Sequence, residues 1–270
     1  MKGYFLPCAA LLSFCLNIAT TQAAELTLEL GDQGQTWSTA ELLALPQTRD
    51  ITIASDVSYK RKMHYKAVPL AVLLKSVKPG EHIQAIAADG FAAELPAAPL
   101  LSTQGARAWL AIEEPSRPWP ILGNKGYSAG PFYLVWENPE ASNIGSEQWP
   151  YQVAKFRLLP SVAERFPNLL PANDASEDVR LGLAQYQKNC MACHRLNKAG
   201  DSQFGPDLNL PHNPTEYFKP GFLSRYIRDP QSMRHWPQGK MPGFGEASIS
   251  NTELNQLLAY LSHMASRKIE

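Results

Sequence analysis

The chain has 270 residues, of which 25 are Lys or Arg and 25 are Asp or Glu, so its formal net charge is zero. A balanced charge offers no general attraction to nucleic acid or to an anionic membrane surface, and we expect neither as a partner. The length exceeds that of one small domain and predicts two domains.

Residues 1–23 have the pattern of a secretory signal peptide. Lys2 precedes an apolar run from Phe5 to Ile18, and the small residues of a cleavage site follow it, ending at Ala23. The apolar run is too short to cross a bilayer, and no later apolar run is long enough for a transmembrane helix. The pattern predicts export through the Sec channel, cleavage near Ala23 and a location in the periplasm.

Residues 24–159 have the pattern of a mixed α/β domain. A capping box from Ser38 to Glu41 predicts a short helix, and Pro69 at a first-turn position predicts a second one that reaches Leu74. Alternating or continuous apolar residues predict strands over 26–30, 51–53, 91–95, 108–112 and 132–136.

A proline-containing segment, 160–175, separates this domain from an all-α domain at 176–270. Its three prolines predict a semi-rigid linker. Helices are predicted from the cap at Ser176 up to Cys190, around 222–227, and from a second capping box at Ser250 to Met264. Between the last two, 230–245 is predicted to be irregular. The expected fold class of the whole chain is α+β.

The segment Cys190-Met191-Ala192-Cys193-His194 has the Cys-x-x-Cys-His spacing of a c-type haem attachment site. The two thiols, one helical turn apart, add to the two porphyrin vinyl groups, and His194 then offers Nε2 to the iron. A zinc site would need a second ligand pair, and a thioredoxin-type pair would follow a strand; the sequence provides neither. One covalently attached haem c is the predicted cofactor.

The iron needs a second axial ligand if the protein only transfers electrons. Met241 lies in a polar loop bounded by Gly and Pro, where a Met has little reason to fill a core, and we predict it as that ligand. His263 and Met264 belong to the last helix and are expected to be core residues. Met233 and His235 remain the main alternatives. The full set of candidates after the haem motif is His212, Met233, His235, Met241, His263 and Met264.

Residues 177–266 resemble a class I cytochrome c. The residues that carry the resemblance are Gly182, Tyr186 and Cys190 at four-residue spacing, Leu257 and Tyr260, Gly205-Pro206-Asp207-Leu208, and Met241-Pro242. The resemblance implies that Gly182 lets the first and last helices of the domain cross closely. It also implies that His194 and Met241 are the axial ligands, and that the Pro206 carbonyl accepts the Nδ1 proton of His194.

Residues 64–159 resemble the molybdopterin-binding domain of the sulfite oxidase type, through segments 67–74, 89–91 and 130–135. In catalytic members of that family a Cys thiolate ligates molybdenum, whereas residues 24–189 contain no Cys. Enzymes of this type tend to be exported folded behind a twin-Arg signal, and Lys2 is the only basic residue among the first 48. We therefore expect a sulfite-oxidase-like fold that has lost molybdopterin.

Other polar and aromatic residues of this domain give no second active site. His64 and His82 have no paired partners in the sequence and are interpreted as single surface histidines, and the pair Glu113-Glu114 as solvated carboxylates. Four aromatic residues are interpreted as core rather than as a docking surface: Trp119, Trp136, Trp149 and Tyr151.

These features predict a periplasmic monohaem c-type cytochrome that transfers single electrons between redox partner proteins and is not itself an enzyme. The first domain is then a module for partner docking. One alternative is a haem-bearing subunit or enzyme of a molybdopterin-type oxidoreductase that acts on a small oxyanion such as sulfite. Another is a haem-based sensor or gas binder whose sixth ligand is labile.

Overall fold

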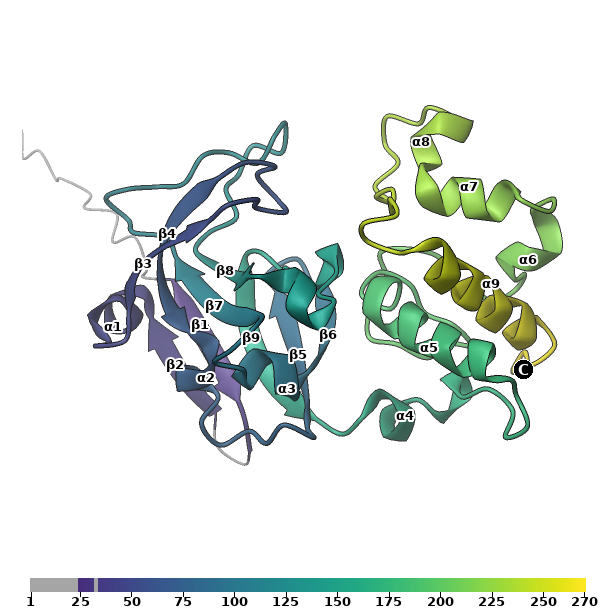
Figure 1. The fold of residues 1–270 in the computed structure, drawn as a ribbon, viewed down its shortest axis with the longest axis horizontal. Coiled ribbons are helices and arrows are strands. Elements are labelled where there is room, and N and C mark those ends of the chain that lie inside the picture. The colour runs from purple at the N-terminus through teal and green to yellow at the C-terminus, as the bar shows by residue number, and fades with distance from the viewer. Residues whose placement is uncertain (1–23, 32–33) are drawn as a thin grey trace, which may run out of the picture.

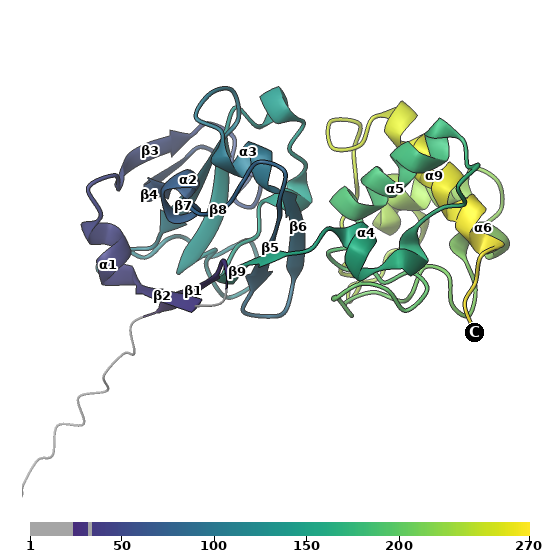
Figure 2. The ribbon, with the colours of Figure 1, turned by 90° about the horizontal axis from the view of Figure 1, so that it is seen from below.

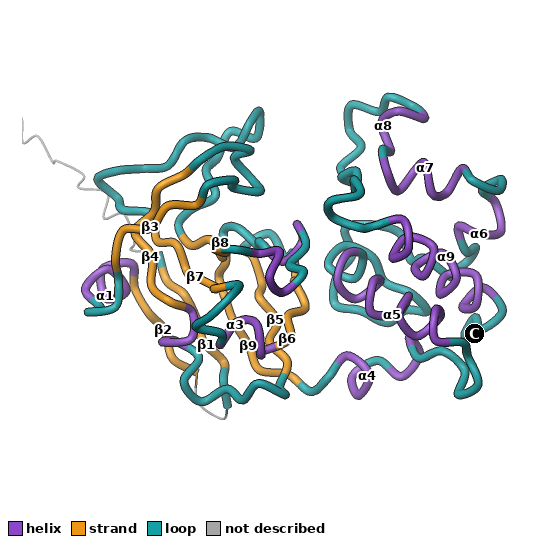
Figure 3. Tube along the Cα trace, viewed as in Figure 1, coloured by secondary structure: helices purple, strands orange, loops and turns teal. Residues whose placement is uncertain are grey.

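The computed structural model describes residues 24–31 and 34–270, which form two parts lying side by side (Figure 1). The first part contains the strands, together with loops and short helices, and the second contains helices joined by loops (Figure 3). The chain passes from one to the other after its last strand. The observed class is α+β, as predicted. The signal peptide predicted at 1–23 lies outside the described residues.

The first domain contains two β-sheets. The five-stranded sheet has the spatial order β2 (Gly34–Ser38), β1 (Glu25–Glu29), β9 (Val153–Leu159), β5 (His82–Ala87) and β6 (Ala92–Pro96). The four-stranded sheet has the order β3 (Arg49–Ile53), β4 (Met63–Pro69), β7 (Arg107–Ile112) and β8 (Phe132–Glu137). Strands β1 and β9 run parallel, with Leu28 opposite Phe156, and the other pairs are antiparallel. The first and last strands of the first domain are therefore neighbours in one sheet.

The core of this domain lies between the two sheets. Leu26 and Phe156 from one sheet and Leu110 and Leu134 from the other are fully buried in a single apolar cluster. Strands β7 and β8 are buried along nearly their whole length, which explains why their sequences are continuous apolar runs rather than alternating ones.

Short helices pack against the strands of both sheets. Helix α1 (Thr39–Ala44) begins with the predicted capping box, in which Ser38 Oγ accepts from Glu41 N and Glu41 Oε2 accepts from Ser38 N. The other short helices of this domain are α2 (Leu70–Leu73), α3 (Ala97–Leu101), η1 (Pro139–Ser142) and η2 (Ser146–Gln148).

The second domain is built on two crossing helices, α5 (Glu177–Asn189) and α9 (Asn251–Ala265). A Cβ added to Gly182 would lie 2.0 Å from the Gln256 carbonyl oxygen, and the Tyr186 and Tyr260 rings lie 5.7 Å apart. The predicted close crossing at Gly182 is confirmed. In the part of the chain that the structure describes, α9 included, no helix has the length and apolarity needed to span a membrane.

The remaining helices of the second domain are short: α4 (Val162–Arg165), η3 (Pro167–Leu169), α6 (Pro214–Tyr217), α7 (Phe222–Arg228) and α8 (Pro230–Met233). Helix α8 interrupts the stretch that the sequence predicts to be irregular. It forms because Asp229 caps it, with its side chain accepting from the backbone N–H groups of Gln231 and Ser232.

The segment predicted as a linker packs on the helical domain. Val162, Leu169 and Ala175 are buried in the same apolar cluster as α5 and α9, and Tyr260 Oη donates to the Leu169 carbonyl at 2.8 Å. Figure 2, seen from below, shows α4 beside the other helices, where the chain enters the helical domain after β9. Residues 161–175 thus contribute to the core of the second domain.

Two side-chain expectations for the first domain are wrong. His82 is not an isolated surface residue, because Nε2 bonds Glu94 and the side chain is largely buried. Glu113 is not solvated, because one carboxylate oxygen accepts from Trp119 N and Ser128 Oγ. Among the four aromatic residues Trp136 and Trp149 are buried core, as expected, whereas Trp119 and Tyr151 are only partly buried.

Candidate functional site

The Cys-x-x-Cys-His segment follows directly on the C-terminal end of α5. Cys190 N still donates to the Tyr186 carbonyl, and Cys193 N and His194 N both donate to the Cys190 carbonyl, so the backbone continues in a tight turn. Tyr186 Oη donates to the His194 carbonyl at 2.9 Å. Helix α5 and this turn therefore fix both cysteines and the histidine in one short unit.

Both cysteine thiols are partly buried and free of a disulfide. Burial is the main cause that raises the pKa of the Cys190 and Cys193 thiols to about 12, and the nearby Glu147 carboxylate adds to it. At neutral pH the thiols are therefore protonated, unlike the low-pKa thiolates of redox-active cysteines.

The His194 ring is held from one side by the loop that follows it. Nδ1 lies 2.8 Å from the Pro206 carbonyl oxygen, an acceptor that requires the proton on Nδ1. Burial lowers the pKa of His194 despite this hydrogen bond, so the ring is neutral near pH 7 and the lone pair is on Nε2. A neutral imidazole with a fixed tautomer is the form that ligates iron.

Gly205 forms the wall of the pocket around this ring. A Cβ at that position would lie 2.3 Å from His194 Cε1 and 2.4 Å from Nδ1. Only glycine leaves room for the imidazole here, and the ring packs directly on the backbone of the Gly205-Pro206 turn.

Met241 is partly buried and packs against the helical core. The loop that contains it is held to α7, because Phe244 N donates to the Ile227 carbonyl and Arg228 Nη1 donates to the Phe244 carbonyl. Gly243 brings the two backbones together, since a Cβ there would lie 2.6 Å from the Arg228 carbonyl oxygen. The loop can therefore hold a side chain in a defined place without a helix.

The other axial candidates have different environments. Met264 is buried in the core, and His263 Nε2 accepts from Ala172 N, so both have structural roles. His212 and His235 are exposed, and Met233 is half-buried at the end of α8. Met241 remains the predicted ligand, with Met233 and His235 as alternatives.

The residues present fit a covalently attached haem. Two thiols lie in one turn at the end of α5, a neutral imidazole is fixed through Nδ1, and a glycine makes room for its ring. Residues 179–265 match the family model described as Cytochrome c. The C-terminal domain is a cytochrome c domain. No curated protein sequence matches the chain.

The cytochrome c domain supports haem c binding and a haem-based role in electron transfer, which implies redox partners. The match leaves residues 24–178 outside it, so the first domain has to be interpreted from its own contacts.

The first domain packs on α5 close to the haem-attachment turn. Gly145, just before η2, lies against the helix, where an added Cβ would be 3.0 Å from Lys188 Cε and 3.3 Å from Asn189 Oδ1. Among the described residues, Lys188 Nζ and Asn189 Oδ1 are buried without a hydrogen-bond partner. On the neighbouring helix Glu253 Oε1 accepts from Asn143 Nδ2 at 3.2 Å. Sequence reasoning missed this interface, because nothing in the pattern of η2 marks it.

The pKa of the Glu147 carboxyl group of η2, at this interface, is strongly shifted. Burial raises its pKa from 4.5 to about 7, against smaller effects of Ser146, Lys60 and Lys125 that lower it. The folded protein therefore binds this proton more tightly than the unfolded chain. Ionisation of the buried carboxyl group therefore lowers the stability of the fold very little below pH 4.5, increasingly between pH 4.5 and 7, and by its full amount above pH 7.

We expect Glu147→Gln to stabilise the protein at about pH 8, by up to about 3 kcal/mol, and to leave stability at about pH 4 unchanged. The measurement is the denaturation midpoint of the full chain at both pH values. Glu140→Gln, at an exposed position of η1, is the matched control and should have no effect at either pH. An equal gain in both variants would contradict the burial of Glu147.

Proposed function

We propose that this chain is a periplasmic monohaem c-type cytochrome that passes single electrons between redox partner proteins. The observation that carries the proposal is the Cys190–His194 attachment segment at the end of α5, within the region that matches cytochrome c. Secretion behind the predicted signal at 1–23 supports the location, since haem c is attached outside the cytoplasmic membrane.

Each proposed site residue has a distinct role. Cys190 and Cys193 tether the porphyrin, and His194 and Met241 are the proposed axial ligands. Haem c, when bound, supplies a one-electron Fe(III)/Fe(II) couple. The Pro206 carbonyl keeps the proton on Nδ1, and Gly205 leaves space for the ring, so the chain presents Nε2 in one orientation.

The first domain is proposed to govern which partner reaches the haem. Its contact with α5 at Gly145 supports this, because a partner that approaches the attachment turn meets the first domain beside it. The same proposal includes a sulfite-oxidase-like fold, which rests on the resemblance of segments 67–74, 89–91 and 130–135, and the loss of molybdopterin, which is supported by the absence of Cys from residues 24–189. Molybdenum analysis of protein from its native host separates this proposal from an oxyanion-oxidising enzyme.

Met241→Ala tests the proposal of an electron carrier with two protein ligands. We expect wild-type reduced protein to bind carbon monoxide weakly, and Met241→Ala to bind it avidly, because the sixth position of the iron is opened. The measurement is the change in the visible spectrum on addition of carbon monoxide to the reduced holoprotein.

Met233→Ala is the matched control, since Met233 is the same residue type only eight positions earlier and should leave the spectrum unchanged. If Met233→Ala opens the site and Met241→Ala does not, the ligand assignment is wrong. Avid carbon monoxide binding by the wild type would instead indicate a gas-binding protein.

A further inference from the structure

The loop from Arg195 to Leu208 folds back onto the haem-attachment turn. Gly205 N donates to the Cys193 carbonyl of the turn, and Leu208 N donates to the Arg195 carbonyl and closes the loop, each at 2.8 Å. The Pro206 carbonyl in the same loop faces His194 Nδ1. The place of this loop therefore fixes the acceptor that orients the imidazole.

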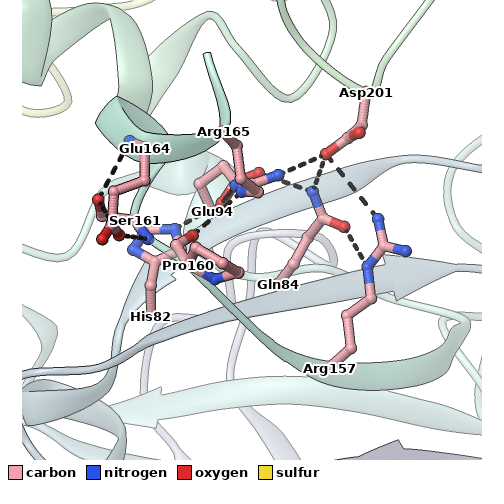
Figure 4. Close-up of polar contacts among 9 residues, drawn as sticks. All are labelled: His82, Gln84, Glu94, Arg157, Pro160, Ser161, Glu164, Arg165 and Asp201. Carbon is pink, nitrogen blue, oxygen red and sulfur yellow. Dashed lines mark hydrogen bonds and ion pairs between the residues drawn. The ribbon is translucent and has the colours of Figure 1, made fainter. Parts of the chain in front are cut away.

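Asp201 extends from the middle of this loop into the first domain (Figure 4). Its Oδ2 accepts from Gln84 Nε2 of β5 at 2.6 Å and from Arg165 Nη1 of α4 at 2.8 Å, and Arg157 Nη2 of β9 lies 3.9 Å away. Three elements outside the haem-attachment segment thus converge on a single carboxylate oxygen.

Glu94 of β6 is the matching carboxylate on the other side of Arg165. Arg165 Nη2 donates to Glu94 Oε2 at 2.8 Å, and the Glu94 side chain is only 3% exposed. Glu94 also bonds His82 and, through Oε1, the fully buried amide of Gln84. Burial opposes the ionisation of Glu94, but the hydrogen bonds from His82 and Arg165 and the charges of these two groups outweigh it and lower the pKa of Glu94, so it is ionised at neutral pH.

The cluster is balanced in charge and specific in geometry. Two carboxylates face two guanidinium groups, so each charge has a counterpart, and Glu94 and Arg165 are the most buried of the four. Gln84 donates to both carboxylates and accepts from Arg157 Nε at 2.9 Å, which fixes the orientation of its amide. Arg165 spans two acceptors with two different nitrogens, which a lysine ammonium does not reproduce.

Helix α4 presents Arg165 in this orientation. Ser161 and Glu164 form a capping box at its start, Arg165 Nε donates to the Pro160 carbonyl, and the guanidinium lies over the Phe166 ring. Besides its bonds to the two carboxylates, the Arg165 side chain is therefore held by the Pro160 carbonyl and the Phe166 ring.

We propose that Arg165 is a positioning residue that couples the first domain to the haem iron, by holding Asp201 and with it the loop that orients His194. The proposal rests on the proposed function, since it takes His194 as the ligand of a redox-active iron. Through this contact the first domain is part of the proximal environment of the haem. A partner that displaces β5, β6 or β9 then alters the Pro206–His194 hydrogen bond.

Arg165→Lys in the full-length holoprotein is the decisive variant, because it keeps the positive charge and removes the two guanidinium nitrogens that bond Asp201 and Glu94. We expect amide hydrogen exchange at Gly205 and Leu208 to accelerate by about tenfold, since hydrogen bonds to charged groups are among the stronger ones. We also expect the midpoint potential to rise, because a weaker Nδ1 hydrogen bond makes His194 a poorer donor to Fe(III). Asp201→Asn should shift both readouts in the same direction, and the double variant should show less than the sum.

Asp174→Asn removes one carboxylate charge at an exposed position of the same domain and serves as the control. Faster exchange without a change of potential would show that the cluster only holds the domains together, and unchanged readouts in both single variants would equally overturn the proposal. If Arg165→Lys does not fold, Asp201→Asn alone decides between these outcomes. A wild-type protein without a reversible one-electron couple would instead refute the proposed function.

Discussion

Replacing Gly182 by Ala is expected to destabilise the cytochrome c domain strongly, although it adds a single methyl group. The new Cβ would lie 2.0 Å from the Gln256 carbonyl oxygen and 2.6 Å from Tyr260 Cβ. The first of these atoms belongs to the backbone of α9, so no rotamer change relieves the contact and the helices must separate. We expect a loss of at least about 1–3 kcal/mol in the free energy of unfolding, and a larger loss for Gly182→Leu.

The measurement is chemical denaturation followed by the haem and by helical circular dichroism. Ala184→Leu adds volume on the exposed side of the same helix and is the control, with an expected effect within about 0.5 kcal/mol. If Gly182→Leu unfolds at the same denaturant concentration as the wild type, α5 and α9 do not cross at this position.

Gly205→Ala is expected to affect the haem directly rather than stability alone. The added Cβ would lie 2.3 Å from His194 Cε1, so either the imidazole or the Gly205-Pro206 turn must move. Both movements disrupt the hydrogen bond between Nδ1 and Pro206 and misalign Nε2. We expect a changed visible spectrum of the reduced holoprotein, a raised midpoint potential and a loss of about 10–100-fold in the affinity of His194 for the iron, the size usual for disrupted partners of a metal-ligating histidine.

The strength of the bond between His194 and the iron is measured by the acid pH at which protonation displaces His194 and changes the visible spectrum. Gly245→Ala is the matched control, because that glycine lies in the same domain and a Cβ there would meet nothing within 4 Å. Thioether attachment through Cys190 and Cys193 should persist in both variants. Identical spectra and potentials for Gly205→Ala and Gly245→Ala would mean that His194 does not occupy this pocket in the holoprotein.

The sequence predicted those features that depend on neighbouring residues. The capping boxes at Ser38 and Ser250 are local hydrogen-bond patterns, and both form where they were predicted. The buried strands β7 and β8 followed from continuous apolar runs. At the haem site, the attachment motif is recognised from the local spacing of Cys190, Cys193 and His194. The contact of Pro206 with His194 was instead implied by the resemblance to class I cytochrome c.

The features that the sequence did not predict depend on partners distant in the chain. Glu94 occupies an outward position in a seemingly alternating strand, yet it is buried because Arg165, 71 residues later, lies against it. Gln84 meets Asp201 at a separation of 117 residues. Strands β5 and β9 have mixed polar and apolar sequences, since part of their polar surface is covered by the second domain. The three prolines of 160–175 predict a linker, whereas Val162 and Leu169 pack into the core of the helical domain, and their wide spacing in the sequence does not reveal this.

The parallel pair of β1 and β9 determines the order in which the chain can fold. Lys155 and Glu29 pair across 126 residues, so the five-stranded sheet stays incomplete until the last strand of the first domain has been made. Pairings of such long range close slowly, whereas α5, the attachment turn and α9 lie within residues 177–265. The first domain is thus complete only once β9 is in place, and the contact between Asp201 and Gln84 needs both parts of the chain.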